Sequence, residues 1–99
     1  MTERGRRVLE KVVRRIDDVA PPGLGRWGST WDIISEASDR FLDALSRWEH
    51  EDSPSTRANL QNAADSFVRS WRAAAIRWEQ AGRPVDHGAT NLALEGAVR

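Results

Sequence analysis

Two stretches of this chain repeat apolar residues at alternating spacings of three and four, and a short polar segment separates them. The first stretch is Trp31, Ile34, Ser38, Phe41, Leu45 and Trp48, and the second is Leu60, Ala64, Phe67, Trp71, Ala74 and Trp78. This spacing puts the members of each stretch on one face of a helix. Because residues 50–54 between them are polar and few, the sequence predicts an antiparallel helical hairpin.

A third helical pattern precedes the hairpin, with Leu9, Val12, Ile16 and Val19 on one face. We expect it to cover a second apolar stripe of the hairpin, formed by Ile33, Ala37, Ala44, Val68, Ala75 and Ile76. The predicted fold is therefore an all-α three-helix bundle over residues 1–84. Residues 85–99 form a tail with a weak helical pattern, which either docks as a short helix or frays.

Local signals place the three helices at about residues 2–20, 29–51 and 54–82. The boundary residues are Pro21 and Pro22 after the first helix, Ser29 or Thr30 before the second, Ser53, Pro54, Ser55 or Thr56 at the start of the third, and Gly82 after it. With the turn near residue 52, facing residues have numbers that sum to about 105. This register predicts Phe41 opposite Ala64, and it gathers four tryptophans at the open end of the hairpin.

The chain has five tryptophans and no tyrosine. Trp31, Trp71 and Trp78 hold positions on the predicted buried faces, so we interpret them first as core residues. The alternative is a partner-binding surface at the open end, since tryptophan and arginine are the residues that protein interfaces use as anchors. The candidates for that surface are Trp27 and Arg26 in a glycine-flanked loop, together with Trp78 and Arg77.

Charge argues against a general affinity for nucleic acid, because fifteen basic and fifteen acidic residues cancel. A local basic run in the first helix could still contact phosphates, and its members are Arg4, Arg6, Arg7, Lys11, Arg14 and Arg15. Two of them have an acid four residues earlier, in the pairs Glu3–Arg7 and Glu10–Arg14, which is typical of a solvated helix face. We therefore regard nucleic acid as possible but the less favoured partner.

No catalytic or metal-binding motif is present. The chain lacks cysteine, and His50 lies beside Glu49, Glu51 and Asp52 without a second set of ligands. Neither His50 nor His87 has the spacing to a serine or acid that a known catalytic motif requires. We expect no enzymatic activity, cofactor, metal or small-molecule substrate. The N-terminus lacks an apolar signal, and no apolar run reaches membrane-spanning length, so we expect a cytoplasmic protein without a membrane partner.

The length and the hairpin are similar to those of the small secreted WXG-type helical hairpins, which carry Trp-x-Gly in the turn. Here Trp27 and Gly28 are adjacent and precede the hairpin, and the chain has no tyrosine for the export signal of those proteins. The chain is therefore not assigned to that family.

The sequence favours a non-catalytic protein-interaction module that binds a protein partner or forms a homodimer. Two alternatives stay open. One is a small nucleic-acid-binding regulator, antitoxin-like or encoded by a phage or plasmid, that uses the basic first helix. The other is an inhibitor of a larger enzyme.

Overall fold

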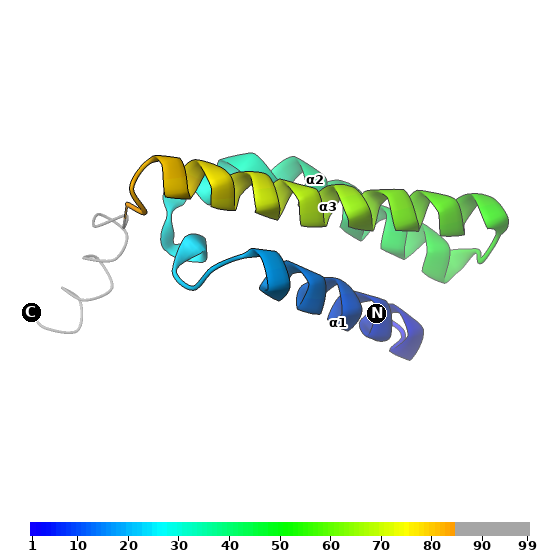
Figure 1. The fold of residues 1–99 in the computed structure, drawn as a ribbon. Coiled ribbons are helices and arrows are strands. Elements are labelled where there is room, and N and C mark those ends of the chain that lie inside the picture. Colours follow the sequence, from blue (N-terminus) through cyan, green and yellow to red (C-terminus); the bar gives the residue numbers. More distant parts are fainter. Residues whose placement is uncertain (85–99) are drawn as a thin grey trace, which may run out of the picture.

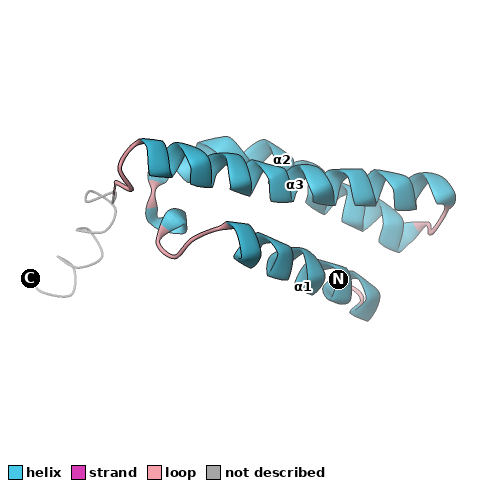
Figure 2. Cartoon of the chain, in the orientation of Figure 1, coloured by secondary structure: helices cyan, strands magenta, loops and turns pink. Residues whose placement is uncertain are grey.

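The computed structural model describes residues 1–84, and within them the chain forms helices and no strand (Figures 1 and 2). The elements are α1 (Glu3–Val19), a short 3-10 helix η1 (Leu24–Arg26), α2 (Gly28–His50) and α3 (Pro54–Gln80). The predicted all-α three-helix bundle is confirmed, and each helix begins and ends within two residues of its predicted boundary. The prediction for residues 85–99 lies outside the described residues.

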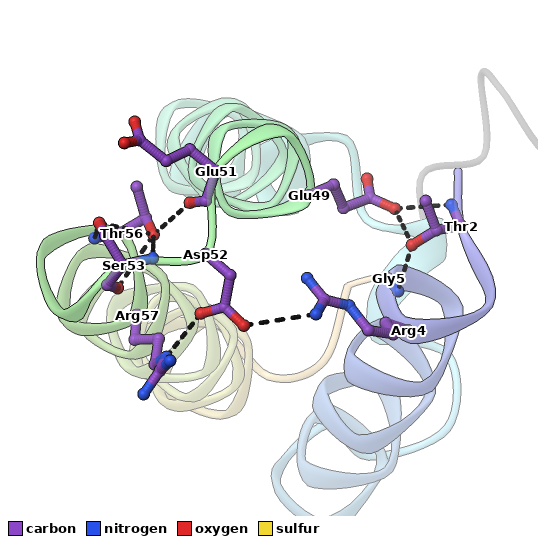
Figure 3. Close-up of polar contacts among 9 residues, drawn as sticks. All are labelled: Thr2, Arg4, Gly5, Glu49, Glu51, Asp52, Ser53, Thr56 and Arg57. Atoms are coloured by element: carbon purple, nitrogen blue, oxygen red, sulfur yellow. Dashed lines mark hydrogen bonds and ion pairs between the residues drawn. The ribbon is translucent and has the colours of Figure 1, made fainter.

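The turn between α2 and α3 is set by a capping box at Ser53. The Ser53 Oγ accepts a hydrogen bond from the Thr56 backbone N–H at 3.2 Å, and the Thr56 Oγ1 accepts one from the Ser53 N–H at 2.9 Å. Pro54 occupies the first helical position, where its missing N–H costs nothing. Of the alternative starts for this helix, the structure selects Ser53 as the cap (Figure 3).

The start of α2 differs from the prediction. Trp27 is the N-cap and makes no side-chain capping bond, so neither Ser29 nor Thr30 caps the helix. Thr30 instead has no exposed surface, and its Oγ1 donates to the Leu24 carbonyl at 2.7 Å. The difference arises from η1, which the sequence did not predict and which brings a buried carbonyl within reach of Thr30.

Two contiguous clusters make up the core. The first joins α1 to the hairpin through Val12 and Ile16, which pack with Phe41, Ala44, Leu45, Leu60, Ala64 and Val68. Phe41 and Phe67 stack with ring centroids 5.5 Å apart, so Phe41 contacts the helical turn beyond Ala64, its predicted partner. The second cluster, at the open end of the hairpin, contains Leu24, Ile34, Ala74, Ala75 and Trp78.

The first helix covers less of the hairpin than expected. Ala44, Val68 and Ala75 are buried as predicted, but Ile76 is 51% exposed. Helix α1 has 17 residues against the 27 of α3, and it ends at Val19, beside Ile76, where the chain turns away to η1. α1 packs mainly against α3 and makes less contact with α2. In the described part of the chain, no helix is long and apolar enough to cross a membrane.

Candidate functional site

The N-terminal end of α1 is tied to the C-terminal end of α2 (Figure 3). The Thr2 backbone N–H and the Thr2 Oγ1 both donate to the Glu49 Oε2 at 2.6 Å, while the Thr2 Oγ1 accepts from the Gly5 N–H as the N-cap of α1. Gly5 is buried against the Glu49 carboxylate, and its missing side chain leaves room for that carboxylate in this position. The hydrogen bonds from Thr2, first from its hydroxyl and then from its backbone, lower the pKa of Glu49.

Arg4 adds a second tie at the same end. Its Nη1 lies 3.3 Å from the Asp52 Oδ2, and its guanidinium stands 4.4 Å from the Trp48 ring centroid. Asp52 also accepts a hydrogen bond from the Arg57 Nε at 2.5 Å, and this bond is the main cause of its lowered pKa. Arg4 and Arg57 thus join α1, the turn and α3 through one carboxylate (Figure 3).

The other end of α1 is held by the loop that leads into α2. Gly23 has a φ of +92°, a left-handed conformation that glycine adopts without strain, and it lies against the Trp78 ring. The next residue, Leu24, is 1% exposed and belongs to the core. The loop therefore anchors α1 to α2 at the open end of the hairpin.

Between these two attachments α1 and α2 diverge, and an apolar groove of about 700 Å³ lies between them, hereafter the α1–α2 groove. Phe41, Phe67 and Trp71 lie among its lining residues, the last two from α3. One bank comes from Leu9, Val13, Ile16 and Asp17 of α1, and the other from Trp31, Ile34, Ser38 and Leu42 of α2. Pro21, Pro22, Leu24 and Gly25 close the end next to η1.

Apolar surface is concentrated at this groove. Five large apolar side chains are exposed in residues 1–84, and three of them line the groove, namely Val13, Trp31 and Leu42 at 43%, 56% and 47% exposure. Scattered single apolar residues are normal on a protein surface, whereas a contiguous set in a concave site is typical of a binding surface. The α1–α2 groove is therefore the candidate functional site.

Trp31 is held in place although it is exposed. Its Nε1 donates to the Gly25 carbonyl at 3.2 Å, and its ring meets the edge of Trp71 with centroids 6.1 Å apart. The prediction that Trp31 is a core residue is wrong, because α1 lies toward α3 and leaves this end of α2 uncovered. Within the described residues the Trp71 Nε1 is buried without a hydrogen-bond partner.

The four residues predicted as a partner-binding surface differ in exposure. Trp78 is only 5% exposed and its Nε1 donates to the Pro84 carbonyl at 2.9 Å, so it is a core residue, as first interpreted, and not an exposed anchor. Trp27 is half-buried and packs against the same core cluster. Arg26 and Arg77 are exposed, and each is adjacent in sequence to one of these two tryptophans. Trp78 is buried because η1 folds over it, a contact that the helical periodicity could not reveal.

Most of the basic run of α1 is engaged with acids of the same chain. Arg4 pairs with Asp52, Arg6 with Glu3 and Glu10, Arg7 with Glu3, and Arg15 with Asp65. Lys11 and Arg14 make no ion pair within residues 1–84. Glu10 pairs with Arg6 and not with Arg14, its predicted partner. In α2, Glu36 pairs with Arg40 and Asp43 with Arg47, each four residues apart.

His50 and the acids near it form no metal site in the part of the chain that the structure describes. The His50 Nδ1 is hydrogen-bonded to the Ser46 carbonyl at 2.8 Å, and no three histidine or acidic side chains of residues 1–84 are grouped as metal ligands. A comparison of the chain with family profiles, curated proteins and solved structures finds no match.

Proposed function

We propose that this chain is a non-catalytic helical interaction module that binds a protein partner in the α1–α2 groove. The observation that carries the proposal is the clustering of Val13, Trp31 and Leu42 on one concave, mainly apolar surface. Recognition in a groove between helices uses apolar anchors of this kind.

The attachments at both ends of the groove support the same proposal. The Thr2–Glu49 hydrogen bonds fix one end, and the buried Leu24 fixes the other. Trp31 is also fixed, by its hydrogen bond to Gly25. A surface that is already ordered loses little conformational entropy on binding, so more of the apolar contact energy appears as affinity.

Nucleic-acid binding through α1 has less support. Four of the six basic residues in the run, Arg4, Arg6, Arg7 and Arg15, already pair with acids. Binding to phosphates would weaken steeply with salt, whereas an apolar groove is nearly indifferent to it. An inhibitor of a larger enzyme would be a special case of the proposed module, with that enzyme as the partner.

Two neutral substitutions of equally exposed residues test the proposal. Leu42→Gln removes an apolar side chain from the groove, and Ile76→Gln removes one from α3 outside that groove. Both keep the net charge and a good helix former. In affinity capture from the source cells, we expect the wild type and Ile76→Gln to retain the same protein and Leu42→Gln to lose it. Equal retention by both variants would exclude the groove, and capture of nucleic acid that salt releases would favour the alternative.

A further inference from the structure

The α1–α2 groove has the position of a missing fourth helix. In a four-helix bundle each helix packs against two neighbours. Here α2 and α1 both pack on α3, and they diverge from each other above Phe67 and Trp71. A helix laid in the groove would contact α1 and α2 and complete the bundle.

The dimensions of the groove set the length of such a helix. The lining residues run from Leu9 on α1 to Ala20, directly after its last residue, and from Trp31 to Leu42 on α2. At 1.5 Å per residue each bank is about 17 Å long, or about three helical turns. The Thr2–Glu49 attachment and η1 limit it at the two ends. Three turns accommodate apolar anchors at positions i, i+3 or i+4, and i+7 of a bound helix.

The rim of the groove carries negative charge. Asp17 lines the groove on the α1 side, and Asp39 lies one turn before Leu42 on the α2 side. Both are exposed, and neither makes an ion pair within residues 1–84. More broadly, residues 29–52 hold seven acids and two bases, a net charge of −5. A bound helix would meet acids on both sides.

A second copy of the described chain does not supply a matching helix. Outside the groove, the large exposed apolar side chains of residues 1–84 are Met1, which precedes α1, and Ile76 on α3. Neither belongs to a ridge that extends over three turns. A helix from another protein, with its own bulky apolar face, fits the groove better.

From this position, length and charge, we infer that the α1–α2 groove binds an amphipathic helix of another protein, about three turns long, whose apolar face is flanked by lysine or arginine. The inference rests on the proposed function and adds the class of partner. The apolar side chains of the bound helix pack on Phe67 and Trp71, which are partly exposed at the groove, and its basic residues lie beside Asp17 and Asp39.

Two synthetic helical peptides test the inference. Both have about fourteen residues, a fluorescent label and the same leucines at i, i+3 and i+7, and they differ in having lysine or glutamate at the flanking positions. Binding to the full chain is measured by fluorescence anisotropy at low salt. We expect the lysine peptide to bind tighter than the glutamate peptide, because its charges attract Asp17 and Asp39. The difference should be only about tenfold, since each exposed ion pair contributes little.

Three variants separate the causes. Asp17→Asn with Asp39→Asn should reduce the difference between the peptides to about twofold. Leu42→Gln should weaken the lysine peptide about tenfold or more, and Ile76→Gln should leave its affinity unchanged. Circular dichroism of each variant verifies that it is folded.

Each other outcome has a distinct meaning. If both peptides bind equally and Leu42→Gln weakens both, the groove is still the binding site, but the inference that its partner is basic is wrong. If Leu42→Gln has no effect, the proposed function itself is wrong. Failure of both peptides to bind overturns the inference, as does a dimer of the chain, seen by light scattering, that Leu42→Gln dissociates.

Discussion

Phe41 and its neighbour Leu42 lie on different faces of α2 and should therefore contribute differently to stability. Phe41 has no exposed surface and stacks on Phe67, whereas Leu42 is 47% exposed at the groove. We expect Phe41→Ala to lower the free energy of unfolding by about 3–5 kcal/mol, from lost burial and the cavity left behind. Leu42→Ala should cost less than about 1 kcal/mol, since much of that side chain is already in water. Urea unfolding measures both, and equal losses would contradict this assignment of the core.

The tryptophans show which residue-level features the sequence could predict. Periodicity correctly placed Trp78 in the core, although its burial is completed by Gly23 and Leu24, a contact that spacing does not predict. It misplaced Trp31, which has the same periodicity but no helix above it. Spacing identifies the apolar side of a helix and not the neighbour that covers it.

Two apolar residues outside every predicted stripe, Val13 and Leu42, were the available signal for the groove. Both are exposed and both line it. Whether these two side chains are covered or line a groove depends on how α1 packs against α3, which the sequence pattern does not determine. The sequence analysis placed its candidate surface at Trp27 and Trp78, whereas the structure concentrates exposed apolar side chains at the groove.

At the level of elements, helix boundaries were predictable because they follow from local chemistry. Ser53 and Pro54 define the start of α3 in the structure as in the sequence. The start of α2 was not, since η1 and the Thr30–Leu24 hydrogen bond depend on a buried carbonyl that only the folded loop supplies.

The attachment of α1 to α2 through Glu49 should depend on pH. Hydrogen bonds from Thr2 lower the pKa of Glu49 in the folded chain, so the unfolded chain takes up the proton first on acidification. The stabilisation is therefore present above the ordinary pKa of 4.5 and is lost as the pH falls through the lower folded value. We expect Glu49→Gln to lower Tm at pH 6, and the difference from the wild type to shrink toward pH 3.

Thermal unfolding followed by circular dichroism across this range measures the effect. Asp39→Asn is the control, because Asp39 is an exposed acid of α2 without an ion pair in residues 1–84. A difference between wild type and Glu49→Gln that is independent of pH would show that the carboxylate charge is not the cause.

For the molecule as a whole, the three helices should differ in local stability. α2 and α3 share the largest interface, whereas α1 contributes only two buried apolar side chains to the core, Val12 and Ile16, and is held mainly by its two ends. We expect native-state hydrogen exchange to show the highest protection in the middle of α2 and α3 and lower protection in α1.

Ile16→Ala should accelerate exchange in α1 and leave the hairpin nearly unchanged, because it removes one of the few buried contacts of α1. Uniform acceleration of all three helices would show instead that the bundle opens as one unit. Since α1 is also one bank of the groove, the lysine-flanked peptide should restore protection in α1 more than in α3.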